Sequence, residues 1–270
     1  MRFCHFLRRL RPAQDAEERR RRWQKELEAV PILTHLGQVD ADRLIALGQA
    51  FLAQKRFVVA GPGVTLTDRL CIRTALMASL PVLTKNLSHY ATFYEVRFHA
   101  DLFEGDAQWQ DELGLVHEET DLLAGEAWEQ GPVQFSVVDI DASGDWSGYN
   151  VVIHELAHKL DMASGEVNGT PPLSLNALSV WQQTLERAFQ TLEQQYHEAL
   201  EQEWGEATIQ QRLPMDPYAL TNRGEFFAVS SESFFTQPHR LAEALPHWYH
   251  CLQSYYGQDP RQRAPKPNQG

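Results

Sequence analysis

Three titratable residues interrupt an apolar segment in the middle of the chain, in the sequence VVIHELAHKLD at positions 151–161. His154 and His158 are four residues apart, so on a helix their side chains lie on the same face. Two imidazoles at this spacing, with Glu155 beside the first, match the H-E-x-x-H pattern of zinc sites. The motif therefore predicts that His154 and His158 are metal ligands and that Glu155 is a general base.

Peptide-bond hydrolysis is the chemistry expected of such a site. Zn²⁺ bound by neutral imidazoles acts as a Lewis acid and lowers the pKa of water to about 7. Glu155 would accept the proton of the attacking water and pass it to the leaving amine. We therefore expect one zinc ion per chain as the cofactor.

A catalytic zinc ion needs a further protein ligand, commonly a carboxylate from a later helix. The segment GEFFAVSSESFF contains two candidates, Glu225 and Glu232, on one helical stripe. Because seven residues span about 10 Å along a helix, only one of them is expected to reach the ion. Glu225 could instead form a capping box with Asn222, and Glu232 could be a solvent-facing acid. Spacing alone leaves the choice between the two glutamates open.

Two other metal-binding patterns do not fit the sequence. A di-iron bundle requires a second Glu-x-x-His pair, and only Glu155 with His158 has this spacing. A metzincin site would have glycine at position 161 and histidine at position 164, where the chain has Asp161 and Ser164.

The motif needs a helix that is anchored at its start and buried along one side. Ser147 is the expected N-cap, because its hydroxyl can accept hydrogen bonds from the free N–H groups of the first turn. The helix would then run through Asp161. An apolar stripe on it comprises Val152, Ile153, Leu156, Ala157 and Leu160.

The remaining elements follow from hydrophobic periodicity. Helical spacing predicts two helices within residues 22–54 that are broken near Pro31, and further helices over 66–80, around 178–196 and over 222–236. Alternation in FYEVRFHA predicts a half-buried strand, and VQFSVVDI (133–140) is a second strand candidate. Helices separated by a few strands indicate an α+β fold.

Composition indicates one soluble globular domain. A chain of 270 residues with 43% hydrophobic content can bury a core without disulfides. Cys4, Cys71 and Cys251 lie far apart and form no C-x-x-C pair, which favours the reducing cytoplasm. The start MRFCHFLRRLRP is too interrupted by arginine for a secretory signal, and no apolar window of about 18 residues predicts a membrane span.

Charge is distributed unevenly along the chain. Residues 1–30 carry nine Lys/Arg and five Asp/Glu, whereas the whole chain has a net charge of −12. An acidic body repels nucleic acid, and the acids interleaved in the basic segment are typical of a solvated helix, so we expect no nucleic-acid partner. We expect a flexible basic arm over residues 1–21, one domain over 22–258 and a disordered tail over 259–270.

Several longer segments resemble the Mlc titration factor A family of zinc metallopeptidases, whose catalytic domain is similar to that of anthrax lethal factor. These segments are QKRFV, ELGLVHEE, EQGPV, DASGDWSGYNVVIHELAHKLD and DPYALTNRGEFFAVSSESFF, and the resemblance covers most of residues 22–260. It implies a zincin-like fold with a small mixed sheet beside the motif helix. It also suggests that the strand VQFSVVDI pairs with an extended peptide substrate.

The resemblance assigns roles to individual residues. The family's third zinc ligand corresponds to Glu225, and the tyrosine seven residues earlier, Tyr218, would donate a hydrogen bond to the oxyanion of the tetrahedral intermediate. Tyr218 could otherwise be a buried turn residue after Pro217. Many gluzincins carry an aspartate four residues after the ligand glutamate, where this chain has Val229. Asp161 could support the site instead, or could be merely a helix-terminal acid.

Two functions are therefore expected. The first is a gluzincin-like zinc peptidase acting on peptides, with aminopeptidase activity suggested by the resemblance. The alternative is a regulatory protein that sequesters a transcriptional repressor of the Mlc type, which controls sugar uptake genes. Glu155 favours the enzyme, because a purely structural zinc site has no use for a general base and is usually closed by a fourth ligand.

Overall fold

The computed structural model describes residues 14–100 and 131–266 of the chain. Within these ranges three strands form one sheet in the order β1 (Arg56–Val59), β2 (Glu95–His99) and β3 (Val133–Ser136). Both neighbouring pairs are parallel. The first pair is parallel because its connection runs through helix α3 (Asp68–Ser79), which returns the chain in the same direction. The expectation of a mixed sheet is therefore wrong for the described strands.

One of the two predicted strands is confirmed, and the other is confirmed only in its first half. FYEVRFHA contains β2, in which Val96 and Phe98 are fully buried. VQFSVVDI is a strand only in its first half, because Val137 begins the helix α5 (Val137–Ala142). The hydroxyl of Ser136 caps this helix by accepting a hydrogen bond from the N–H of Asp139 at 3.3 Å.

The N-terminal helices are confirmed. The helices α1 (Gln14–Glu28) and α2 (Gln38–Gln54) are separated by a 3-10 turn at Pro31–Leu33. They cross closely because Gly48 has no side chain: a Cβ atom there would lie 2.6 Å from the Trp23 ring. Helix α3 fills most of the predicted 66–80 segment and begins at its N-cap Thr67.

The second half of the chain is helical. Its α-helices are α6 (Val151–Met162), α7 (Leu175–Glu201), α8 (Glu206–Arg212), α9 (Arg223–Thr236), α10 (Pro238–Ala244) and α11 (Pro246–Tyr256). The long helix near 178–196 and the helix over 222–236 are thus confirmed as α7 and α9. Proline at the first position of α10 and α11 fits a helix start, where no N–H bond is lost. Trp181, Phe227 and Tyr255 join α7, α9 and α11 through edge-on ring contacts.

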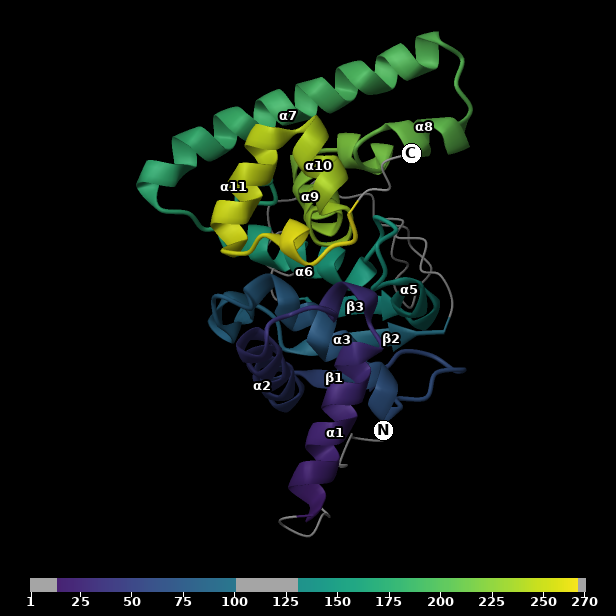
Figure 1. Cartoon of the computed structure of the whole chain (residues 1–270), viewed down its shortest axis with the longest axis vertical. Coiled ribbons are helices and arrows are strands. Elements are labelled where there is room, and N and C mark those ends of the chain that lie inside the picture. The colour runs from purple at the N-terminus through teal and green to yellow at the C-terminus, as the bar shows by residue number, and fades with distance from the viewer. Residues whose placement is uncertain (1–13, 101–130, 267–270) are drawn as a thin grey trace, which may run out of the picture.

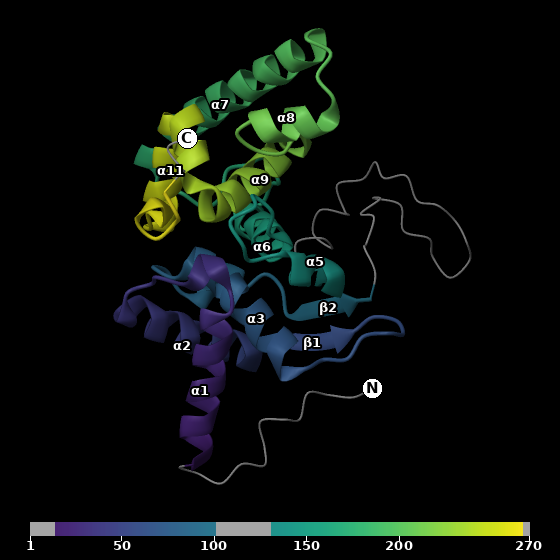
Figure 2. The same ribbon diagram turned by 45° about the vertical axis from the view of Figure 1, so that its right-hand side comes forward.

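Helix α6 connects the two halves of the molecule. Figures 1 and 2 both place it between the sheet with α1, α2 and α3 and the group of helices from α7 to α11. It packs against α3 and β3 on one side and against α9 on the other. No helix in residues 14–100 or 131–266 is long and apolar enough to cross a membrane.

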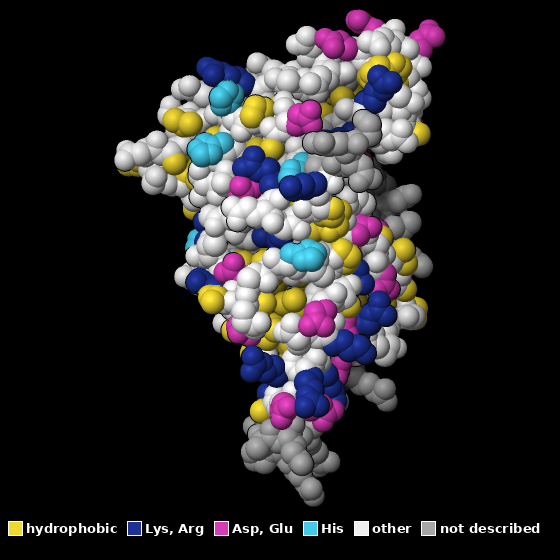
Figure 3. All heavy atoms as spheres, in the orientation of Figure 1, with side chains coloured by type: hydrophobic (Ala, Val, Ile, Leu, Met, Phe, Trp, Pro, Cys, Tyr) yellow, Lys and Arg dark blue, Asp and Glu magenta, His cyan; other side chains and the backbone are white. Residues whose placement is uncertain are grey.

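The terminal segments differ in part from the predictions. Asp259 accepts a hydrogen bond from the hydroxyl of Tyr249 at 2.7 Å, and Pro260–Gln262 form a 3-10 turn, so the predicted disorder is wrong for the start of the tail. In the predicted basic arm, α1 begins at Gln14, and Lys/Arg and Asp/Glu side chains alternate on the surface there (Figure 3). Residues 1–13, which include Cys4, and the segment ELGLVHEE lie outside the described residues.

Candidate metal centre

Asn150 anchors the helix that carries the motif. Its side-chain oxygen accepts a hydrogen bond from the N–H of Ile153 at 3.0 Å, and this makes it the N-cap of α6. The prediction of Ser147 as N-cap is wrong, because that hydroxyl lies before the helix and accepts from the N–H of Tyr149 at 3.4 Å. The predicted apolar stripe is confirmed, since its five side chains are fully buried.

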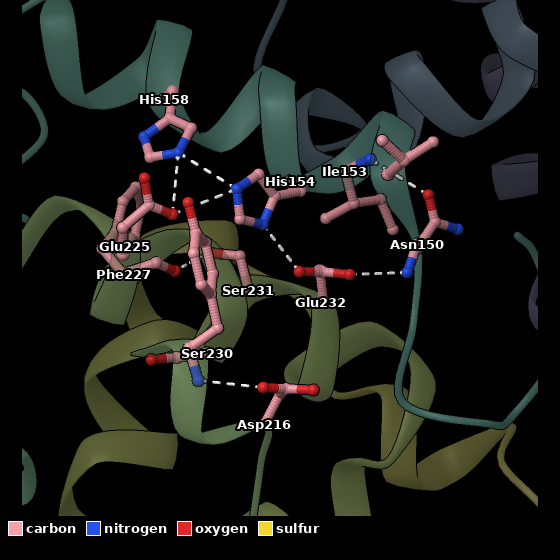
Figure 4. Close-up of polar contacts among 12 residues, drawn as sticks. Asn150, Ile153, His154, His158, Asp216, Glu225, Phe227, Ser230, Ser231 and Glu232 are labelled. Atoms are coloured by element: carbon pink, nitrogen blue, oxygen red, sulfur yellow. Dashed lines mark hydrogen bonds and ion pairs between the residues drawn. The ribbon is translucent and has the colours of Figure 1, made fainter. Parts of the chain in front are cut away.

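The side chains of His154, His158 and Glu225 converge (Figure 4). The Nε2 atoms of the two imidazoles are 3.1 Å apart. The Glu225 Oε2 atom lies 3.2 Å from the Nε2 atom of His154 and 3.3 Å from that of His158. Asn222 caps α9 by accepting from the Glu225 N–H at 2.9 Å, which leaves the Glu225 carboxylate directed at the imidazoles.

This donor set fits a metal ion. Two imidazole nitrogens and one carboxylate oxygen are the protein ligands of many mononuclear catalytic sites. The Glu225 Oε2 atom is buried and makes no well-formed hydrogen bond, although it lies near both imidazoles. A cation at this point would be held by this carboxylate oxygen and by both imidazole nitrogens at once.

The carboxylate of Glu232 contacts the Nδ1 side of the His154 imidazole. Its Oε1 atom lies 2.7 Å from the Nδ1 atom of His154, and its Oε2 atom accepts from the Asn150 N–H at 2.6 Å. The reading of Glu232 as a solvent-facing acid is therefore wrong, because the residue is only 5% exposed. A carboxylate at Nδ1 fixes a proton there, so Nε2, on the side of Glu225, is the nitrogen that a metal ion can bind once it displaces the Nε2 proton.

The charges at this centre are strongly coupled. Burial alone would lower the pKa of His154, but the neighbouring carboxylates of Glu225 and Glu232 outweigh it and raise the pKa well above its ordinary value. For Glu225, burial would raise the pKa, and the adjacent imidazoles of His154 and His158 outweigh it and lower the pKa to about 2. Glu225 is thus ionised at neutral pH, as a metal ligand requires.

Asp161 stabilises a loop and makes no hydrogen bond with His158 in the described part of the chain. Its Oδ2 atom accepts from the N–H of Gly169 at 2.7 Å. Gly169 in turn packs against the backbone of Arg223 at the start of α9, where a Cβ atom would lie 2.4 Å from the carbonyl oxygen. Asp161 therefore holds this loop against the turn that carries Glu225. Burial raises the pKa of Asp161 to about 6.

An open cleft of about 730 Å³ lies beside Glu155 of α6 and Glu232 of α9. Glu155, His154 and Tyr218 line it, together with Gln134 and Ser136 of β3. Tyr218 is 53% exposed, so it is not the buried turn residue of the alternative interpretation. Its ring centroid lies 6.2 Å from that of His154. Burial and the charges of Glu225 and Glu155 raise the pKa of Tyr218, which keeps the phenol protonated and able to donate.

The sequence-based reasoning missed two features of this region. One is the contact of Glu232 with His154, although a glutamate seven residues after a ligand glutamate could have indicated it. The other is a pair at the cleft wall, where Tyr149 hydrogen-bonds to Asp139. Burial and this carboxylate raise the pKa of Tyr149, and no local sequence pattern marks the pair.

Comparisons with known proteins agree with the geometry of the centre. The family model described as glucose-regulated metallo-peptidase M90 matches residues 5–257. A relative named Mlc titration factor A from Pectobacterium atrosepticum is 37% identical over 242 residues, which cover 89% of this chain and 87% of the relative. Proteins of the same name from Escherichia coli O6:K15:H31 and Yersinia pestis are each 36% identical over 89% of this chain, and the match covers 87% and 86% of their lengths.

Proposed function

The chain belongs to the glucose-regulated metallo-peptidase M90 family, and from this premise we propose that it is a zinc-dependent peptidase with a zincin-like, gluzincin-type site. The convergence of His154, His158 and Glu225 beside an open cleft carries the proposal. His154 and His158 come from one face of α6, and Glu225 comes from the first turn of α9. We place the protein in the cytoplasm, as its cysteine usage suggests.

These three residues would hold one zinc ion per chain. A bound zinc ion supplies Lewis-acid chemistry, since it polarises a carbonyl group and lowers the pKa of water to about 7. Glu232 would hold the Nδ1 proton of His154, so that Nε2 donates its lone pair to the ion when the ion displaces the Nε2 proton. Glu232 is not a ligand, but it would fix the tautomer of His154 that metal binding requires.

The chain's own residues perform the proton transfers. Glu155 lines the cleft next to His154, where it would accept the proton of the attacking water. It would return this proton to the leaving amine as the C–N bond breaks. Tyr218 would donate a hydrogen bond to the carbonyl oxygen as it becomes negatively charged.

The lining of the cleft favours a peptide with a free amino terminus. Asp139, Glu155 and Asp216 contribute carboxylates to it, and a terminal ammonium group is attracted to such a wall. Gln134 and Ser136 of β3 line the same cleft and would contact an extended substrate lying along this strand. These contacts support an aminopeptidase that acts on short peptides.

The test compares Glu155→Gln with Glu225→Ala in protein purified without chelator. Glu155→Gln removes the proton acceptor without removing a ligand, so it should keep about one zinc per chain while turnover of unblocked peptides falls at least about 10²-fold. Glu225→Ala should lose both zinc and turnover. Wild-type turnover by Glu155→Gln, or absence of zinc from the wild-type protein after reconstitution, would contradict the proposal.

The name of the relatives, Mlc titration factor A, favours a second function, the binding of a transcriptional repressor of the Mlc type. An interface of ordinary size covers an outer surface much larger than the cleft. Glu155→Gln should therefore retain affinity for purified Mlc repressor, measured by titration calorimetry. Loss of repressor binding together with turnover, at intact zinc content, would mean that the two functions share one site.

A further inference from the structure

One wall of the cleft at the metal centre is a stripe of residues on α9. The residues that line the cleft from this helix and its C-cap are Val229, Glu232, Ser233 and Gln237. Their spacing places them on one face of the helix. Because a helix rises about 1.5 Å per residue, the stripe leads about 18 Å from the level of Glu225 to that of Gln237. The cleft therefore extends along α9, away from the metal centre.

Arg240 of α10 lies beyond the far end of this stripe. It is the only lysine or arginine among the described residues that line the cleft, and its side chain is partly buried. Burial lowers the pKa of Arg240, and no carboxylate among the described residues raises it again. The carboxylates of the cleft wall, such as Asp139 and Glu155, therefore leave this cation unneutralised.

Neutral acceptors hold the guanidinium of Arg240 in place. Its Nη2 atom donates to the backbone carbonyl of Gln210 at 3.2 Å and to that of Gln211, both in the last turn of α8. Its Nη1 atom donates to the Oε1 atom of Gln237 at 3.4 Å. These bonds leave at least two of the five guanidinium N–H donors available to a ligand.

The loop before α6 restricts the movement of Gln237. The Nε2 atom of Gln237 donates to the carbonyl of Ser147. The next residue, Gly148, has a φ of 103°, and a Cβ atom there would lie 3.0 Å from the Gln237 side chain. Only glycine allows this close approach at such a φ value. Arg240 is thus oriented before a ligand binds, which lowers the entropic cost of binding.

We propose that Arg240 binds a carboxylate of the peptide substrate and thereby selects short peptides. This inference rests on the proposed peptidase function, which places the scissile bond at the metal centre. A guanidinium forms charge-assisted hydrogen bonds with a carboxylate. An extended peptide spans about 3.3–3.6 Å per residue, so a stripe of about 18 Å accommodates about five residues. A peptide of this length presents its ammonium group to the acidic wall and its carboxylate to Arg240.

The test compares alanine-based peptides of about three to eight residues, each made with a free carboxyl terminus and as the amide. Calorimetry on the full chain with Glu155→Gln measures binding without cleavage. At the length that spans the stripe, the acid should bind at least about fivefold more tightly than the amide.

Adding Arg240→Gln should reduce this preference to less than about twofold, whereas Arg240→Lys should keep part of it, because the charge remains. The matched control is Arg212→Gln. Arg212 lies on α8 with its guanidinium 4.5 Å from the centroid of the Trp204 ring, and it does not line the cleft. This control should keep the full preference. Because each variant is compared with itself on two peptides, a change in folding or zinc content that weakens both alike does not alter the ratio.

Amidated peptides that end in glutamate identify the source of the carboxylate. If they bind as tightly as the free acids, an acidic side chain also serves; if only the free acids bind tightly, the ligand is the carboxyl terminus. The proposal is overturned if acid and amide bind alike at every length, if no peptide binds, if the preference persists in Arg240→Gln, or if Arg212→Gln abolishes it as well.

Turnover of the same peptides by the chain with Glu155 intact separates this inference from the proposed function. The preference for the acid should appear in KM, with kcat nearly unchanged, because Arg240 lies far from the reacting atoms. Absence of turnover with the binding preference retained would contradict the peptidase function alone. Turnover of acid and amide with equal KM would contradict the role of Arg240 alone.

Discussion

Replacing Glu232 with glutamine tests whether this residue prepares His154 for metal binding. The Oε1 atom of a glutamine can still accept from the N–H of Asn150, which now donates to Glu232 at 2.6 Å. The amide nitrogen would then face the Nδ1 atom of His154, where the carboxylate oxygen now lies at 2.7 Å. Because an amide nitrogen only donates, the Nδ1 proton loses its acceptor, and the tautomer with the proton on Nε2 becomes favoured. That tautomer has no lone pair for the metal.

The magnitude follows from the one bond that is lost. A hydrogen bond to a charged group contributes about 1.5–3 kcal/mol. Loss of a partner that orients a metal-binding histidine lowers metal affinity by about 10- to 100-fold, which corresponds to about 1.4–2.8 kcal/mol. The two ranges agree, so Glu232→Gln should bind zinc about 10- to 100-fold more weakly than the wild-type protein.

Competition with a chromogenic chelator measures this change in affinity. The matched control is Glu186→Gln, which removes a carboxylate that Arg223 binds at 3.0 Å on the surface near the start of α9. This control should change zinc affinity by less than about twofold, because exposed pairs contribute little. Zinc affinity of Glu232→Gln within twofold of wild type would refute the assignment of Glu232 as the group that orients His154.

The remaining predictions concern the cleft, the loop and the helix start. Tyr218→Phe should keep zinc and lower kcat about 10²-fold, because the phenol acts when the oxyanion forms; unchanged kcat would remove Tyr218 from the mechanism. Burial raises the pKa of Asp161 from 3.8 to about 6, so the folded state binds its proton more tightly than the unfolded state. The stabilisation is complete below pH 4 and is lost as the pH rises through 6, by roughly 3 kcal/mol, and Asp161→Asn should flatten this part of the urea-unfolding profile. Asn150→Ala should lower the free energy of unfolding by about 1 kcal/mol or more, whereas Ser174→Ala, at an N-cap that makes no side-chain bond, should change it by less than about 0.5 kcal/mol.

Local sequence was sufficient for the features that depend on one helix alone. The four-residue spacing of His154 and His158 places both imidazoles on one face of α6 whatever the helix packs against. Helical periodicity likewise predicted α9, and it placed Glu225 and Glu232 on one stripe. For the same reason the apolar face of α6 was predicted correctly, because burial of that stripe stabilises any fold that contains it.

Other features depend on contacts between distant segments. Spacing along α9 predicts that only one of Glu225 and Glu232 reaches the ion, but it could not reveal that the two glutamates contact opposite nitrogens of His154. That contact requires the packing of α9 on α6, which no local pattern encodes. The sequence predicts Ser147 as the N-cap because its hydroxyl can accept hydrogen bonds from the first turn. The fold selects Asn150 instead, and the N–H of Asn150 also donates to Glu232.

The end of strand β3 and the burial of Arg263 could not be predicted from local sequence either. β-branched residues in VQFSVVDI favour a strand, yet the chain turns into a helix at Val137, because the Ser136 hydroxyl caps it there. The guanidinium of Arg263 is largely buried because the turn after α11 meets the start of α2, more than 200 residues earlier. Periodicity and propensity act over a few residues, whereas the burial of a charge is decided by whatever segment the fold places beside it.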